Sequence, residues 1–311
     1  MSNKKEKVAA VVVTYNRKDL LKECLNAILR QKKQPDSIII INNASNDGTE
    51  KMLKSNFLKK DIFDYVRLEK NTGSSGGQYV GIKRAYKKGF DWVWCMDDDT
   101  IPEEKTLKEL LKGKAFLTKK RVKNIGFLCS KVYGLEGNSM NVPSIETKSG
   151  KEQGPQWEKY IDKGIARVKS STFVSVMFSR KAIRNCGLPI KEMFIWGDDS
   201  EYTRRISNKY NCYLIGKSKA LHKREIQKRL NILTEKNKER IKNYFYHYRN
   251  NLYNRKKYGG IFKAAIFILA SIKHLVESFF SPPHILKRFT TIAKGVFSGL
   301  FFTPKIRKLN Q

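Results

Sequence analysis

Acidic residues, cysteines and long uncharged apolar runs are all scarce in this sequence of 311 residues. Against 63 Lys and Arg there are only 29 Asp and Glu, which gives a formal net charge of +34. This excess predicts a polyanionic partner or surface, and nucleic acid, anionic lipid or a phosphorylated substrate would each provide one. Hydrophobic residues still make up 40% of the chain, so the composition excludes wholesale disorder.

The five cysteines lack the spacing of a metal site or a disulfide scaffold. They are Cys24, Cys95, Cys129, Cys186 and Cys212, and no two of them form CxxC. We therefore predict that the chain contains no zinc ribbon and that it resides in a reducing compartment. The first residues also lack the apolar core and small-residue cleavage site of a signal peptide, so no secretory leader is expected.

No apolar run is long enough to span a bilayer. The most hydrophobic stretch, residues 261–280, is interrupted by Lys263, Lys273 and Glu277. Its uncharged core, residues 264–272, falls well short of the ~20 residues that a spanning helix needs. The stretch instead predicts an amphipathic helix.

The chain from residue 217 onward differs in charge from the rest. It holds 22 Lys and Arg and 4 Glu, a net charge of +18. Residues 261–280 and a second apolar patch, residues 295–303, have basic flanks, which favour helices that lie in the lipid headgroup region. A helical subdomain packed on the rest of the chain is the alternative. We predict one domain over residues 1–225 and a basic, membrane-associating helical region over residues 226–311.

Short apolar runs alternate with helical patterns in the N-terminal half. The predicted strands are residues 8–13, 37–41, 65–68 and 91–96, and the predicted helices are residues 18–31, 49–55 and 75–88. This order predicts an α/β fold with a mostly parallel, Rossmann-like sheet flanked by helices. In such sheets ligands bind at the carboxyl ends of the strands.

The middle of the chain is less regular. Residues 125–132 and 171–178 have the composition of strands. Residues 134–164 are rich in Gly, Ser and Lys and predict a mobile loop, with a lid as one interpretation.

A triple aspartate follows the fourth predicted strand. Asp97, Asp98 and Asp99 place like charges close together at a sheet edge, which is costly unless a cation neutralises them. Asp97 and Asp99 point the same way in an extended segment, so both can reach one ion. Their hard oxygens suit Mg²⁺ or Mn²⁺, which would bridge a diphosphate. A solvated acidic turn or a helix cap near Thr100 is the alternative.

A second acidic cluster lies in the segment Trp196-Gly-Asp-Asp-Ser-Glu-Tyr. Asp198, Asp199 and Glu201 stand beside aromatic rings at the predicted start of a helix near Ser200. A carboxylate there, partly desolvated by the tryptophan, can act as a general base. An N-cap with first-turn acids that complement the helix dipole would explain one of the aspartates, but it accounts less well for the adjacent rings.

Three further features are weak on their own. The segment 71–81 contains Gly76 and Gly77, and such glycines let a phosphate or sugar approach the backbone, but a flexible turn is the alternative. His222 follows a strand-like run, and a single histidine is more often structural than a ligand. The aromatic segment 244–253 could stack on nucleic-acid bases, although its helical spacing favours an amphipathic seam.

Taken together, the motifs occur in the order of a known family. The chain carries Val11-Val-Val-Thr-Tyr-Asn-Arg, Ile41-Asn-Asn-Ala-Ser-Asn-Asp-Gly-Thr, the glycine-rich segment, the triple aspartate and the WGDDSEY segment. This ordered set resembles the inverting family 2 glycosyltransferases with the GT-A fold, over residues 7–255. The triple aspartate, WGDDSEY and the segment Tyr244-Phe-Tyr-His-Tyr-Arg-Asn-Asn-Leu-Tyr look most like galactofuranosyltransferases and their rhamnosyltransferase relatives.

The resemblance implies groups of site residues. The nucleotide-sugar group is Thr14, Tyr15, Arg17, Asn42, Gly76, Gly77, Asp97 and Asp98. The metal group is Asp97, Asp99 and His222. The acceptor group is Trp196 and Glu201, and the catalytic base is Asp199, with Asp198 as second choice. Asn42 stands where the family usually has an Asp that contacts the uridine.

The resemblance also implies an activity and partners. We expect an inverting transferase that uses Mn²⁺ or Mg²⁺ and moves a sugar from a nucleotide-sugar donor to a lipid-linked saccharide at the cytoplasmic face of the cell membrane. UDP-galactofuranose is the favoured donor, with a deoxythymidine-diphosphate rhamnose as the alternative. The basic region would bind an anionic membrane surface, and nucleic acid is not expected as a partner, because the clustered acids would repel its phosphates. The oligomeric state stays open, with a homo-oligomer as one option.

Overall fold

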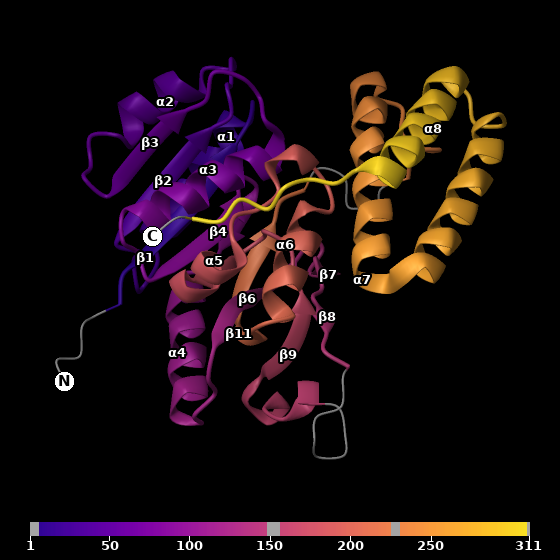
Figure 1. Ribbon diagram of the computed structural model, residues 1–311. Coiled ribbons are helices and arrows are strands. Elements are labelled where there is room, and N and C mark those ends of the chain that lie inside the picture. The colour runs from indigo at the N-terminus through magenta and orange to yellow at the C-terminus, as the bar shows by residue number, and fades with distance from the viewer. Residues whose placement is uncertain (1–5, 148–155, 225–230, 310–311) are drawn as a thin grey trace.

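The computed structural model describes residues 6–147, 156–224 and 231–309, and a large mixed sheet forms its centre (Figure 1). The sheet has 11 strands in the order β3-β2-β1-β4-β10-β6-β11-β9-β8, with β5 paired to β11 and β7 paired to β6. Helices cover its faces, and a separate group of helices stands beside it.

The N-terminal half forms the parallel part of the sheet. Its strands are β1 (Val8–Thr14), β2 (Ser37–Asn42), β3 (Phe63–Arg67) and β4 (Trp92–Asp97), and its helices are α1 (Lys18–Leu29), α2 (Thr49–Asn56) and α3 (Gly73–Lys87). β1 pairs in parallel with β2 and β4, and β2 pairs in parallel with β3. Every residue of β1 is buried, as expected for a strand covered on both faces.

The second half extends the sheet mainly with antiparallel pairs, although β11 pairs in parallel with β6. Its strands are β5 (Thr100–Pro102), β6 (Ile125–Tyr133), β7 (Ser139–Met140), β8 (Ser144–Ile145), β9 (Ile165–Ser170), β10 (Val176–Ser179) and β11 (Asn211–His222). Its helices are α4 (Thr106–Lys119), α5 (Arg180–Cys186) and α6 (Asp198–Ser207), with single 3₁₀ turns at Gln156–Glu158, Ile161–Lys163 and Lys191–Met193.

The structure corrects two predictions for the middle of the chain. The strand predicted over 171–178 begins only at Val176, and it runs antiparallel between β4 and β6. The segment predicted as one mobile loop, 134–164, contains β7, β8 and two 3₁₀ turns in its described parts; residues 148–155 lie outside the described residues. The predicted α/β fold, a mostly parallel sheet with flanking helices and a C-terminal helical region, is confirmed.

The C-terminal helices form a bundle of three segments, which are the two arms of α7 and the helix α8. α7 (Lys238–Ser278) is broken at Gly260, whose φ of 72° and ψ of −177° lie outside the helical region. The chain reverses there, so that Tyr248 Oη on the first arm lies 2.8 Å from His274 Nδ1 on the second. α8 (Ile285–Phe301) packs between the two arms (Figure 1).

The second arm of α7 carries exposed apolar side chains. Phe262 is 75% exposed and Leu269 is 66% exposed. In the part of the chain that the structure describes, α7 is the one helix long and apolar enough to cross a membrane, judged by length and composition. The break at Gly260 divides that length between two antiparallel arms.

The residues after α8 return to the sheet domain. Figure 1 shows this yellow segment crossing from the bundle toward α5 and α3. Leu188 N donates to Arg307 O over 2.9 Å, and Arg307 Nη1 lies 2.7 Å from Glu192 Oε1. The bundle is therefore joined to the sheet domain at both ends.

Candidate active site

The candidate site lies at the carboxyl ends of β1 and β4, where ligands bind in parallel α/β sheets. Val13 at the end of β1 is in register with Asp97 at the end of β4. Thr14 Oγ1 donates to Asp98 Oδ2 over 2.8 Å, and both side chains are buried. Tyr15 next to them is 43% exposed and open to a ligand.

Arg17, just before α1, provides the first positive charge at this edge. Its Nη1 lies 3.3 Å from Asp98 Oδ1 and 2.9 Å from Asp99 Oδ2. Burial alone would lower the pKa of Arg17, but Asp98 and Asp99 outweigh burial and raise it. Arg17 therefore binds the triple aspartate, a contact that the sequence analysis did not predict.

The carboxylates of β4 are not fully neutralised by this arginine. Burial, followed by the charges of Asp99 and Asp98, raises the pKa of Asp97 to about 7. Burial also raises the pKa of Asp98 to about 6, against the opposing effect of Arg17. Both pKa values are raised mainly because burial disfavours the charged form, and the neighbouring carboxylates add to this effect.

His222 supplies a second group that faces the triple aspartate. β11 pairs with β5, which places His222 opposite Thr100. His222 Nε2 lies 3.2 Å from Asp99 Oδ1, and Nδ1 lies 2.8 Å from Asn141 Oδ1. Burial would raise the pKa of Asp99, but His222 and Arg17 outweigh it and lower it. Asn141, which orients the ring, lies in the segment that the sequence analysis treated as a mobile loop.

The predicted metal group is brought together only in part. Asp99 Oδ1 is buried, and the imidazole of His222 lies 3.2 Å from it. Carboxylate and imidazole are suitable ligands for Mn²⁺. Within the described residues, however, no three His, Cys, Asp or Glu side chains lie close enough together to form a metal site. Asp97 Oδ1 lies 3.5 Å from Ser74 Oγ.

The second acidic cluster faces the first. α6 begins at Asp198, whose Oδ2 is buried without a hydrogen-bond partner. Burial, the charge of Asp199 and the charge of Asp97 raise the pKa of Asp198 well above its ordinary value. The start of α3 connects this cluster to the triple aspartate, because Ser74 Oγ lies 3.5 Å from Asp97 Oδ1 and Ser75 N donates to Phe194 O in the loop before α6.

Asp199 is the more accessible of the two aspartates. It is half-buried, whereas Asp198 is 4% exposed. Its Oδ1 accepts a hydrogen bond from Ser200 N over 2.5 Å. Burial raises the pKa of Asp199 above its ordinary value despite that bond, which suits a proton acceptor at neutral pH.

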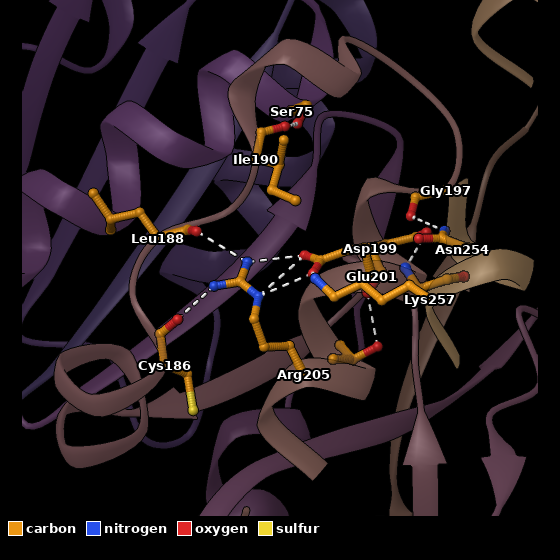
Figure 2. A network of polar contacts seen from close by, with 12 residues as sticks. Ser75, Cys186, Leu188, Ile190, Gly197, Asp199, Glu201, Arg205, Asn254 and Lys257 are labelled. Carbon is orange, nitrogen blue, oxygen red and sulfur yellow. Dashed lines mark hydrogen bonds and ion pairs between the residues drawn. The ribbon is translucent and has the colours of Figure 1, made fainter. Parts of the chain in front are cut away.

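The structure gives Glu201 a different environment from the one expected of an acceptor contact. Glu201 is fully buried, and Figure 2 shows its carboxylate between Arg205 and Lys257. Arg205 Nη2 lies 2.8 Å from Oε2, Lys257 Nζ lies 2.8 Å from Oε1, and Tyr258 Oη also donates to Oε1. No oxygen of Glu201 is left for an acceptor, so its role is to join α6 to α7.

The structure likewise gives the predicted glycines a packing role. Gly76 and Gly77 are buried inside α3 and not in a turn. A Cβ on Gly77 would lie 2.4 Å from Val13 Cγ1, and one on Gly76 would lie 2.3 Å from Thr72 Oγ1. Gly77 thus lets α3 pack closely against β1, whereas Gly76 leaves room for the side chain of Thr72.

Asn42 is also engaged within the protein. It is fully buried, and its Nδ2 donates to Tyr65 Oη while its Oδ1 accepts from Ser45 N. The next residue, Asn43, was missed by the sequence analysis. Its side chain bonds Asn71, Thr72 and Gly73, which ties the loop after β2 to the start of α3.

The aromatic segment forms a seam inside the bundle, as its spacing indicated. Tyr244 and Tyr248 are buried in a cluster with Ile241 and Ile292. Trp196 packs against this seam, with its ring 5.0 Å from that of Tyr244. Trp196 is half-buried, and its contact with the acceptor stays a prediction.

Comparison with known proteins bears directly on this arrangement. Residues 9–116 match the sequence model of glycosyl transferase family 2. This chain carries a family 2 glycosyltransferase domain. The match covers β1 to α4, and so includes the triple aspartate.

Relatives and solved structures agree with the domain assignment. The chain is 24% identical over 215 residues to galactofuranosyltransferase GlfT1 of Mycolicibacterium smegmatis, which is 65% of each chain. It is 29% identical over 210 residues to the Mycobacterium tuberculosis GlfT1, 65% of this chain and 64% of that one. The match thus spans somewhat less than two thirds of these relatives. The crystal structure of GalNAc-T7 with UDP, GalNAc and Mn²⁺ covers 83% of this chain and 52% of its own, with a TM-score of 0.57 and 14% identity, which shows a shared fold.

Replacing Glu201 by glutamine tests its role in joining α6 to α7. Glu201→Gln leaves Arg205 buried without its counter-charge, and we expect the free energy of unfolding at neutral pH to fall by about 3–5 kcal/mol. Burial would raise the pKa of Glu201, but Arg205 and Lys257 lower it below 4.5. Its stabilising effect is therefore complete above pH 4.5 and is lost as the pH falls through the lower folded-state pKa. Urea unfolding of both proteins should show a difference that shrinks below pH 4.5.

The matched control for Glu201 is Glu239→Gln. Glu239 forms an exposed pair with Lys242. Its replacement should leave the urea midpoint unchanged at every pH. A stability difference for Glu201→Gln that does not vary with pH would contradict the proposed ion pairs.

Proposed function

We propose that this protein is a metal-assisted inverting glycosyltransferase that moves galactofuranose from UDP-galactofuranose to a lipid-linked saccharide. The observation that carries the proposal is that the start of α3 joins the two acidic motifs. Ser74 Oγ lies 3.5 Å from Asp97 Oδ1, and Ser75 N donates to Phe194 O in the loop before α6. Sugar transfer needs a group that holds the diphosphate and a base that activates the acceptor, and the two motifs supply one of each.

The donor group consists of residues at the ends of β1, β4 and β11. Arg17 and Tyr15 stand where a nucleotide diphosphate would lie, and Asp98, held by Thr14, faces the sugar. Asp99 and His222 would hold Mn²⁺ or Mg²⁺, with Asp97 as the third predicted ligand. When bound, the ion neutralises the charge that develops on the departing diphosphate.

Asp199 is the proposed base. Its carboxylate takes the proton from an acceptor hydroxyl, whose oxygen bonds to the anomeric carbon while the bond to the diphosphate breaks on the opposite face. Asp199 suits this role better than Asp198, because an acceptor arriving from solvent reaches a half-buried side chain before a fully buried one. Trp196, two residues before the acidic pair, is the proposed acceptor contact.

The second arm of α7 is the proposed membrane-binding element of residues 226–311, at the cytoplasmic face of the membrane. Exposed apolar side chains recur along it every three or four residues, at Phe262, Ile266, Leu269, Ile272, Val276 and Phe280. Lys263 and Lys273 lie on the same arm. An apolar stripe of this kind with basic neighbours lies in the plane of an anionic membrane. A lipid-linked acceptor would then be present at the same surface.

The base is tested by replacing each aspartate in turn. Asp199→Asn should lower kcat by about 10²–10⁴-fold while UDP binding is retained, because only the proton acceptor is lost. Asp198→Asn is the matched variant. The assay is release of UDP from a panel of nucleotide sugars in the presence of acceptor, which also separates UDP-galactofuranose from deoxythymidine-diphosphate rhamnose. Near-normal turnover by Asp199→Asn would remove it as the base.

The metal group is tested by binding alone. Asp99→Ala, Asp97→Ala and His222→Ala should each weaken UDP binding in Mn²⁺ by at least about tenfold, because each removes a proposed ligand. Isothermal titration with and without Mn²⁺ measures the effect, and the exposed Asp61→Ala serves as control. Unchanged isotherms for all three variants would refute metal dependence at this site.

The membrane-binding element is tested on vesicles that contain phosphatidylglycerol. Phe262→Glu with Leu269→Glu should weaken co-sedimentation by at least about tenfold per residue, since each removes a buried apolar side chain from the headgroup region. Leu135→Glu, at a position 58% exposed on the sheet domain, is the control. If the double variant sediments with the vesicles as well as the Leu135→Glu control does, the apolar stripe is excluded as the membrane contact.

A further inference from the structure

The loop before α6 holds a backbone conformation that is rarely adopted. Phe194 has φ of 63° and ψ of −66°, and Ile195 N donates to Met193 O over 2.7 Å, which together form the strained, positive-φ kind of γ-turn. Trp196 has φ of 61°. Such residues persist only when their surroundings fix them.

Two asparagine side chains of α7 hold this loop by its carbonyl groups. Asn250 Nδ2 donates to the carbonyls of Met193, Ile195 and Trp196 over 2.8, 3.0 and 2.8 Å. Asn254, one helical turn later, donates to the carbonyl of Gly197 over 2.8 Å (Figure 2). The bonds end directly before Asp198.

The amide of Asn250 is itself fixed in orientation. It is fully buried, and Arg249 Nε donates to its Oδ1 over 3.0 Å, which turns the Nδ2 group toward the loop. Arg249 Nη2 donates to Glu192 O, and the guanidinium lies 4.0 Å from the ring centre of Phe302. The tail after α8 therefore supports the same contact.

α3 holds the loop from its other side. Ser75 N donates to Phe194 O over 3.0 Å, and Ser75 Oγ donates to Ile190 O over 2.7 Å (Figure 2). Gly73 packs so closely on this turn that a Cβ would lie 2.1 Å from Phe194 O. The loop is thus fixed between α3 and α7.

From this geometry we propose that Asn250 and Asn254 are positioning residues for the aspartates at the start of α6. α7 binds the chain on both sides of that pair: through Asn254 at Gly197 before it, and through Lys257 at Glu201 after it. The first arm of α7 is therefore part of the active-site framework and is not a separate membrane attachment. This inference rests on the proposed function in one respect, which is that Asp199 is the base that the two asparagines position.

Alanine variants with a matched control test the proposal. Asn254→Ala removes one bond and Asn250→Ala removes three, so we expect kcat to fall about tenfold and about a hundredfold, with the donor KM within twofold of normal. Asn251→Ala is the control, because among the described residues the Asn251 side chain bonds His247 of its own helix and no residue of the loop. It should leave kcat unchanged. A rise in donor KM with normal kcat for both variants would overturn the proposal, and if Asn250→Ala does not fold, Asn254→Ala decides.

A second readout does not depend on activity. Trp92 and Trp94 are buried, so in a Trp157→Phe background Trp196 is the tryptophan accessible to acrylamide. Asn250→Ala and Asn254→Ala should increase its quenching, and Asn251→Ala should not. Unchanged quenching in both variants would overturn the proposal even if kcat falls. If the wild-type protein transfers no sugar, the proposed function fails, while quenching still decides whether the asparagines hold the loop.

Discussion

Repulsion among buried carboxylates is the constraint on which the site depends. Asp98 and Asp198 are buried and Asp97 is half-buried, and the pKa of each is raised by burial and by neighbouring acids. Arg17 and His222 offset part of this charge through Asp98 and Asp99. A site with this imbalance favours a bound cation, which is the property that a diphosphate leaving group requires.

Much of the fold follows from periodicity in the sequence. The runs 8–13 and 37–41 are so uniformly apolar that only strands covered on both faces accommodate them, and the structure has them as β1 and β2. Local patterns also located the acids, because consecutive aspartates after an apolar strand are unusual without a function. The antiparallel course of β10 was not predictable in this way, since it depends on β4 and β6 and not on its own residues.

The errors at the site share one physical cause, which is contact between distant segments. A glycine before a helix looks alike whether a ligand or a strand approaches it, and only Val13 shows that Gly77 serves packing. Glu201 resembles a site acid until Lys257, 56 residues later, is seen to bind it. Arg249 and Asn250 were recognisable in the sequence as part of a family-like motif. Their contact, the backbone of the loop before α6, has no sequence pattern that identifies it.

The course of the tail after α8 has a consequence for the architecture as a whole. The chain leaves the sheet domain after β11, builds the bundle, and returns to it at Arg307. The bundle is therefore attached to the sheet domain at two places and does not hang on a single linker. Rotation of the bundle about one hinge is then impossible without breaking the contacts at Leu188 and Glu192. The tail after α8 also reaches α3, where the Arg307 guanidinium lies 6.0 Å from the ring centre of Tyr79.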